Sequence, residues 1–283
     1  MADNPSSRTA LVTGGSSGIG MATACRLAGL GFEVYAAARR VDRMKDLKAQ
    51  GISPISMDVT EDSTMTFGVE RILSETGRID VLVNNAGYGS YGAVEDVPLD
   101  EGRGQFEVNL FGMARLTQLV LPQMRERGSG RIINVSSIGG KVGMPMGAWY
   151  HATKFAVEGL SDSLRQEVAP FGIKVVVIEP GAIDTEWGGI AMDSLAERSG
   201  SGAYADQVAK LSQTFESQAG GMSRSKPEVV AKAIGTAANS ARPRPRYAVG
   251  LGAKPLTYAR RLLPDPVFDR ALKLSLSAMS RGS

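Results

Sequence analysis

The sequence TALVTGGSSGIG at residues 9–20 joins an apolar strand to a glycine-rich turn and the start of a helix. Residues 9–13 are the expected strand, and apolar positions then recur at helical spacing from Ile19 to Leu30. Glycines let the backbone turn tightly and approach a ligand closely, and the helix that follows begins with free N–H groups and a positive dipole end. The stretch therefore predicts a phosphate-binding turn; the alternative is a turn with a structural role only.

Outward from this stretch, strands and helices alternate along the chain. The expected strands are apolar on both faces, which indicates a parallel sheet covered by helices on both sides. We expect strands at residues 9–13, 32–38, 52–58, 79–84, 131–136 and 173–179. We expect helices at residues 19–30, 43–50, 61–76, 104–127, 149–169 and 227–238. The sequence thus predicts an α/β fold of the Rossmann type, a doubly wound parallel sheet with helices on both faces, in a single domain.

The segments around this core predict the domain organisation. We expect a flexible N-terminus at residues 1–8, the Rossmann domain at 9–240, and a C-terminal extension at 241–283 packed on the same domain. The regular pattern weakens at about residues 186–226, where Ser and Gly are frequent and one helical stretch stands out near 204–218. A long insertion of this kind often covers a ligand site, so we interpret it as a lid; the alternative is a variable pair of surface helices.

The C-terminal extension is strongly basic. The 283-residue chain has a net charge of +3, but residues 241–283 hold nine Lys and Arg against two Asp, which leaves −4 for residues 1–240. This charge indicates either a solvated, Pro-rich segment or contact with a membrane surface or an acidic partner. No nucleic-acid recognition motif accompanies it, so we expect no nucleic-acid partner. An apolar helical pattern predicts an amphipathic helix that covers the substrate cleft or rests on a membrane, formed by Phe268, Leu272, Leu276 and Met279.

Composition excludes several classes of site. The single cysteine, Cys25, excludes a disulfide framework and a cysteine zinc site, and the single histidine, His151, excludes histidine clusters, so we expect no metal. The longest apolar runs, such as residues 175–178, are far shorter than the ~20 residues of a membrane span. The first residues lack an apolar signal-peptide stretch, and a cytoplasmic location is the expectation.

The residues after the second expected strand indicate which dinucleotide the turn would hold. In NAD-binding folds, an acidic residue about twenty positions beyond the glycines accepts a hydrogen bond from the adenosine ribose. Here the strand ends in three alanines followed by Arg39 and Arg40. No carboxylate would repel a phosphate there, and guanidinium groups pair with phosphates. The sequence therefore predicts NADP(H) as the cofactor; the alternative is that both arginines begin a solvated helix.

Six motifs in order resemble those of the short-chain dehydrogenase/reductase family. The resemblance covers residues 9–238, and the glycine spacing G-x-x-x-G-x-G argues against the extended subgroup of sugar epimerases. It implies an NADP-dependent oxidoreductase that acts on CH–OH groups. The motifs are TGGSSGIG at 13–20, Asp58-Val59, Asn84-Asn85-Ala86-Gly87, Asn109, Ser137 with Tyr150-x-x-x-Lys154, and Pro180-Gly181 followed by Thr185.

The expected catalytic residues are Asn109, Ser137, Tyr150 and Lys154. Tyr150 and Lys154 are four apart and share one face of a helix, so we expect the ammonium to lower the pKa of the phenol, which can then exchange a proton with a carbonyl or alcohol oxygen. The resemblance implies that Ser137 bonds the substrate oxygen, that Lys154 holds the nicotinamide ribose, and that Asn109 anchors a proton-carrying water. Ser136 competes with Ser137 for this role. Taken singly, each residue could have a structural role only. Tyr150 and Lys154 could be an ordinary pair on a helix, Ser137 a helix cap, and Asn109 a buried amide.

The resemblance also implies the cofactor contacts. Ser17 and Arg39 are expected closest to the 2′-phosphate, Asp58 and Val59 beside the adenine, and the Thr185 hydroxyl at the nicotinamide amide. The full expected set is Gly14, Ser16, Ser17, Gly18, Ile19, Gly20, Arg39, Arg40, Asp58, Val59, Asn85, Ala86, Gly87, Tyr150, Lys154, Pro180, Gly181, Ile183 and Thr185.

Bulky apolar residues near the expected catalytic groups predict an apolar carbonyl or alcohol as the small-molecule substrate, unless these side chains belong to the core. The expected substrate contacts are Tyr88, Met144, Met146, Trp149 and Trp187. The chain is similar in motif to the 17β-hydroxysteroid and retinol dehydrogenase branch, which implies a bulky carbonyl. His151 follows Tyr150 but points about 100° away from it on a helix, so we expect it to be structural.

The resemblance further implies a homo-oligomer, because helices corresponding to 104–127 and 149–169 build interfaces in this family. The long extension favours a dimer over a tetramer. The leading functional hypothesis is an NADP(H)-dependent carbonyl reductase or alcohol dehydrogenase. A second hypothesis, from another class, is an NADP(H)-binding redox sensor or scaffold with little turnover.

Overall fold

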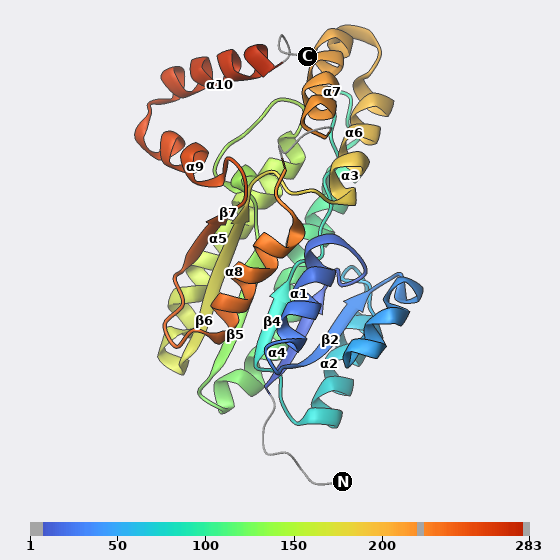
Figure 1. Cartoon of the computed structure of the whole chain (residues 1–283), viewed down its shortest axis with the longest axis vertical. Coiled ribbons are helices and arrows are strands. Elements are labelled where there is room, and N and C mark those ends of the chain that lie inside the picture. The colour runs from blue at the N-terminus through green and yellow to red at the C-terminus, as the bar shows by residue number, and fades with distance from the viewer. Residues whose placement is uncertain (1–7, 220–223, 280–283) are drawn as a thin grey trace.

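A twisted sheet runs through the centre of the computed structural model, which describes residues 8–219 and 224–279 (Figure 1). Within these residues the sheet has seven strands in the order β3-β2-β1-β4-β5-β6-β7, and every neighbouring pair is parallel. The strand order reverses beside β1, and open sheets of this kind bind ligands at the carboxyl ends of the strands around that point. The strands are β1 (Thr9–Thr13), β2 (Glu33–Ala38), β3 (Ile52–Ser56), β4 (Val81–Asn84), β5 (Gly130–Val135), β6 (Ile173–Pro180) and β7 (Arg246–Val249).

Helices cover both faces of the sheet because successive strand residues point to opposite sides. Val12 packs on the side of α1 and α8, and Leu11 packs on the side of α2, α4 and α5. The predicted doubly wound α/β fold is confirmed. The α-helices are α1 (Gly18–Ala28), α2 (Asp62–Thr76), α3 (Leu99–Phe106), α4 (Gly112–Glu126), α5 (Ala148–Val168), α6 (Glu186–Ser199), α7 (Ala205–Ala219), α8 (Pro227–Asn239), α9 (Ala253–Leu262) and α10 (Asp265–Met279).

Two helical segments differ from the expectation. The helix expected at 104–127 begins earlier, as α3, and passes through a π-helical turn, η2 (Glu107–Phe111), before α4. The segment expected as a helix at 43–50 is a 3-10 helix, η1 (Val41–Gln50), held by buried Met44 and Leu47. Apolar spacing predicts that a segment is helical, but it does not distinguish these hydrogen-bonding patterns from an α-helix.

The expected lid segment contains two helices, α6 and α7, at the top of the view in Figure 1, where the sequence predicted only the second. The extension supplies a seventh strand at the edge of the sheet, β7, and then α9 and α10. Helix α10 packs against α7 and α9, with Phe268 buried and Leu272 half-buried. The side chains of Leu276 and Met279, and residues 1–7 of the segment expected to be flexible at 1–8, lie outside the described part. Within the described ranges, every helix is too short or too polar to cross a bilayer.

Candidate active site

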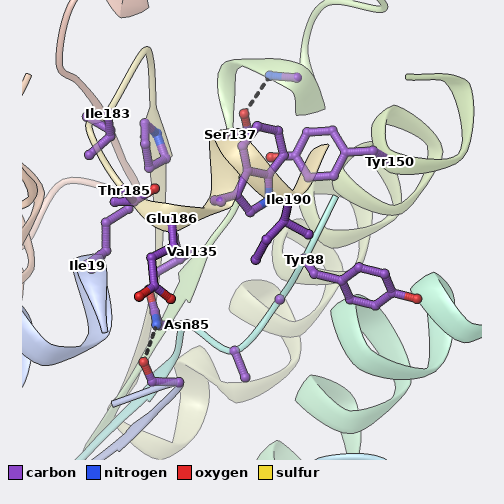
Figure 2. Close-up of a pocket in the computed structure, with 18 of the residues that line it drawn as sticks. Ile19, Asn85, Tyr88, Val135, Ser137, Tyr150, Ile183, Thr185, Glu186 and Ile190 are labelled. Atoms are coloured by element: carbon purple, nitrogen blue, oxygen red, sulfur yellow. Dashed lines mark hydrogen bonds between the residues drawn. The ribbon is translucent and has the colours of Figure 1, made fainter. Parts of the chain in front are cut away.

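A cavity of about 480 Å³ opens at the carboxyl ends of the strands, around the point where the strand order reverses. It extends from the arginines after β2, past the glycine turn, to Ser137 and Tyr150, which lie close together in Figure 2. The expected cofactor residues that line it are Gly14, Ser16, Ser17, Gly18, Ile19, Arg39, Arg40, Asp58, Val59, Asn85, Ala86, Gly87, Tyr150, Lys154, Pro180, Gly181, Ile183 and Thr185. Gly20 is absent from this lining.

Gly20 lies behind the lining because it packs against the turn itself. A Cβ at this position would lie 2.1 Å from the Gly14 carbonyl oxygen and 2.6 Å from the side-chain nitrogen of Asn85, Nδ2. The Asn85 backbone N–H donates to the Thr13 hydroxyl at 3.0 Å, which fixes the turn to the loop after β4. Ser17 precedes α1 without a side-chain cap, so the first N–H groups of the helix remain available to an anion.

The two arginines after β2 have different environments. The Arg39 side chain is 76% exposed and lies 3.9 Å from the Asp58 carboxylate. Arg40 lies 3.6 Å from Glu186 at the start of α6, and Arg43 pairs with the same carboxylate at 2.9 Å. Arg40 therefore pairs with a carboxylate of the lid, whereas the Arg39 guanidinium remains accessible at the mouth of the cavity.

Ser137 and Tyr150 meet because the end of β5 packs against α5. The Gly139 N–H donates to the Ser137 hydroxyl at 3.0 Å in the short helix η3 (Ile138–Gly140). The Tyr150 phenol lies beside the same hydroxyl, which lowers the pKa of the phenol (Figure 2). The Ser136 hydroxyl is buried without a hydrogen-bond partner among the described residues. The geometry thus places Ser137, rather than Ser136, beside the phenol.

Burial controls the ionisation of the Tyr150–Lys154 pair. The Lys154 ammonium donates to the Val135 carbonyl at 2.9 Å and lies 5.8 Å from the centre of the Tyr150 ring. Burial raises the pKa of Tyr150 to about 12, against the opposing effect of the Ser137 hydrogen bond, and lowers the pKa of Lys154 to about 8. The predicted lowering of the phenol pKa is therefore wrong: desolvation of the phenolate is the largest cause, and it raises this pKa. The phenol holds its proton at neutral pH.

Asn109 lies behind the cavity, in the π-helical turn η2. Its amide nitrogen donates to the Tyr88 carbonyl at 2.9 Å and to the Thr153 hydroxyl at 3.0 Å, and its oxygen accepts from the Tyr88 N–H at 3.0 Å. The side chain thereby ties the loop after β4 to the helix that carries Tyr150.

Two aromatic side chains surround Tyr150. The Trp187 and Tyr91 ring centres lie 5.0 Å and 5.9 Å from the Tyr150 ring centre, and 5.9 Å from each other. Tyr88 also lines the cavity, but its hydroxyl turns away to Glu101 at 3.3 Å (Figure 2). Further apolar lining residues come from the lid helices and were not predicted: Ile190, Leu211 and Phe215.

Of the five expected substrate contacts, Met146 and Trp149 do not line the cavity. Met146 is buried in a separate cluster with Leu195. Trp149 packs on α3, where a Cβ at Gly102 would lie 2.7 Å from its ring. We therefore do not retain either as a proposed substrate contact, whereas Tyr88, Met144 and Trp187 line the cavity.

His151 is buried, and it also contributes to the lining of the cavity next to Tyr150. Its Nδ1 lies 3.0 Å from the Gly139 carbonyl oxygen, and burial lowers the pKa of the imidazole. This contact joins α5 to η3 and favours the structural interpretation.

The sheet and this group of cavity residues are typical of one class of protein, the short-chain dehydrogenases. Comparison with known proteins agrees with this assignment. The short chain dehydrogenase family model matches residues 8–193, and the chain belongs to this family of oxidoreductases. A short-chain dehydrogenase structure from Streptomyces avermitilis is 38% identical, with a TM-score of 0.79 over 98% of this chain and 99% of that chain.

Two further relatives bear on the chemistry. A 3-ketodihydrosphingosine reductase from Bacteroides thetaiotaomicron is 44% identical over 178 residues, which is 62% of this chain and 64% of that protein. An alcohol dehydrogenase from the archaeon Thermococcus sibiricus, solved as a complex with 5-hydroxy-NADP, is 26% identical, with a TM-score of 0.65 over 81% of this chain and 88% of that chain.

Proposed function

We propose that this protein is an NADP(H)-dependent oxidoreductase that interconverts a bulky apolar carbonyl compound and its alcohol. The observation that carries the proposal is one continuous cavity with an exposed arginine, Arg39, at one end and the Ser137–Tyr150 pair at the other. A dinucleotide with a 2′-phosphate fits this distribution of charge and donors, and the similar alcohol dehydrogenase that was solved with 5-hydroxy-NADP supports it.

The residues of the cavity fit the cofactor. The uncapped N-terminus of α1 offers N–H groups to the pyrophosphate, and Arg39 offers a guanidinium to the 2′-phosphate. When bound, NADPH supplies the hydride. Tyr150 holds a proton at neutral pH and donates it to the carbonyl oxygen, while Ser137 orients that oxygen by a hydrogen bond. Lys154 carries the positive charge that stabilises the phenolate left behind.

The walls of the cavity support an apolar substrate. Trp187 and Tyr91 enclose the phenol, and lid side chains such as Phe215 extend the apolar surface. Burial of such surfaces against a ligand provides about 25 cal/mol per Å², so a long hydrocarbon is favoured over a small polar ketone. The similarity to a 3-ketodihydrosphingosine reductase points to the same kind of substrate, a ketone with a long apolar chain.

The test measures NADPH oxidation with long-chain ketones, ketosteroids, retinoids, quinones and small aldehydes, with NADH in parallel. Tyr150→Phe removes the proton donor, so we expect turnover to fall by about 10²- to 10⁴-fold while NADPH binding, followed by fluorescence, is retained. A Tyr150→Phe variant as active as the wild type would refute the assignment. Tight NADPH binding without turnover of any compound would favour the redox-sensor hypothesis instead.

We also propose that the protein forms a homo-oligomer through the outer faces of η2 and α5. Phe111 and Phe155 are large apolar side chains exposed on these elements, and large exposed apolar patches mark protein interaction sites. Light scattering of the wild type and of Phe155→Glu tests this. A monomeric wild type would refute it.

A further inference from the structure

Two glutamates are buried beneath the candidate active site, outside the cavity. Glu158 follows Lys154 by one turn of α5, so the two side chains lie on the same face of the helix. Glu179 is in β6, immediately before Pro180 at the cavity wall. Their exposed fractions are 5% and 4%, and acidic side chains are almost never buried this deeply unless they are paired.

Two cations from distant parts of the chain face both carboxyl groups. Lys141 lies 2.7 Å from Glu158 Oε2 and 3.7 Å from Glu179 Oε1. Arg246, from β7 of the extension, lies 3.0 Å and 3.4 Å from the same two oxygens. The charged groups identified around Glu158 are Lys141, Lys154, Asp162, Glu179 and Arg246, and Arg165 pairs with Asp162 in turn.

Within the described part of the chain, each carboxyl group nevertheless retains a buried oxygen without a hydrogen-bond donor, although the Glu179 oxygen is the one that faces the two cations. Among the described residues, Glu158 Oε1 and Glu179 Oε1 receive no hydrogen bond from a donor group. The two carboxyl groups lie close together because they share both cations. Burial, and then the Glu158 charge, raise the pKa of Glu179 against the opposing effects of Lys141 and Arg246. A proton on Glu179 provides the missing donor, since a protonated carboxyl can donate to a carboxylate. It also removes the repulsion between two buried negative charges.

One member of the pair, Glu158, packs against the loop after β5 that carries Ser136 and Ser137. A Cβ at Gly140 would lie 2.7 Å from the Ser136 hydroxyl, 2.8 Å from the Lys154 carbonyl oxygen and 3.0 Å from Glu158 Cγ. No side chain therefore separates Glu158 from the loop that carries the site's serine. The negative charge of Glu158 raises the pKa of Lys154 against the effect of burial.

We propose that Glu179 keeps its proton at neutral pH and donates it to Glu158, and that this carboxyl pair is a positioning device that maintains the positive charge of Lys154. Neither glutamate lines the cavity, so the pair acts through the lysine and not on the substrate. The catalytic meaning of the pair rests on the proposed function, but its protonation and its effect on Lys154 do not.

Infrared spectroscopy of the full chain tests the shared proton. We expect the carbonyl stretching band of a buried protonated carboxyl group at neutral pH, and we expect Glu179→Gln to remove it. The matched control is Glu186→Gln, at an exposed glutamate, which should leave the band in place. Absence of the band from the wild type, or its survival in Glu179→Gln, would overturn the proposal.

NMR titration of ¹³C-labelled lysine tests the effect on Lys154 without any need for turnover, with Lys154→Met to assign the signal. We expect Glu158→Gln to lower the pKa of Lys154 by about 1 unit, because it removes the neighbouring negative charge. We expect Glu179→Gln to leave that pKa unchanged, because an amide replaces a neutral carboxyl group of similar shape. An unchanged Lys154 in Glu158→Gln, or equal shifts in both variants, would contradict the proposal even if the protein proved not to be a reductase.

Discussion

Replacing Arg39 with alanine should weaken the binding of NADPH without affecting the binding of NADH. The Arg39 side chain is 76% exposed and its nearest carboxylate, on Asp58, is 3.9 Å away, so the guanidinium is free to meet a 2′-phosphate. Two unit charges at about 4 Å attract by about 1 to 4 kcal/mol between bulk water and a protein surface. A hydrogen bond to a charged group contributes about 1.5 to 3 kcal/mol. Exposure screens this contact, so we expect about 2 kcal/mol, which corresponds to a ~30-fold higher Kd for NADPH.

Fluorescence titration of NADPH and NADH against the wild type and Arg39→Ala measures this difference. Arg40→Ala is the matched control, because Arg40 is 3.6 Å from Glu186 and should contribute less to the phosphate. Added salt should reduce the difference in the Kd for NADPH between the wild type and Arg39→Ala, since exposed charges are screened. An unchanged Kd for NADPH in Arg39→Ala, or an equal loss of NADH affinity, would refute the assignment of Arg39 to the 2′-phosphate.

Three other predictions follow from the site. Ser137→Ala should lower kcat by about 10²-fold or more while the Kd for NADPH stays constant, because the proposed function assigns this hydroxyl, beside the phenol, to orienting the substrate oxygen. Weaker binding of NADPH with an unchanged kcat would contradict this prediction. Gly20→Ala should destabilise the protein by about 1 to 3 kcal/mol, because the new methyl group would lie 2.1 Å from the Gly14 carbonyl oxygen. Thermal unfolding measures this loss, and an unchanged Tm would show that the turn has room for a methyl group. Lys154 has a pKa of about 8, so its ammonium is present below that pH and lost above it. The kcat/KM for reduction, measured against pH, should therefore fall as pH rises through about 8, and a flat profile would exclude this lysine as the controlling charge.

The sheet and the proximity of two candidate catalytic residues could be predicted from the sequence because they follow from local patterns. Runs such as residues 9–13 are apolar on both faces, and only a strand buried on both sides needs that composition. Tyr150 and Lys154 are one helical turn apart, so their proximity follows from helix geometry alone. Ser137 lies 13 residues earlier, and its place beside the phenol came from the family resemblance rather than from its own spacing.

Features that depend on packing could not be predicted. Trp149 precedes Tyr150 and therefore points about 100° away on the helix, towards α3 and not into the cavity. The raised pKa of the phenol comes from its burial, which no local pattern specifies. Arg246 and Glu158 are 88 residues apart, and they meet only because β7 pairs with β6 beside α5.

The contact of Arg246 with the buried glutamates has a consequence for the order in which the protein matures. Ribosomes release the chain from its N-terminus, so α5 and β6 leave the exit tunnel before β7 exists to pair with them. During that interval β6 is an unprotected sheet edge, and Glu158 and Glu179 lack one of their two cations. The ion pairs that surround the two glutamates in a nascent molecule are therefore completed among the last steps of its synthesis, after α5 and β6 have emerged.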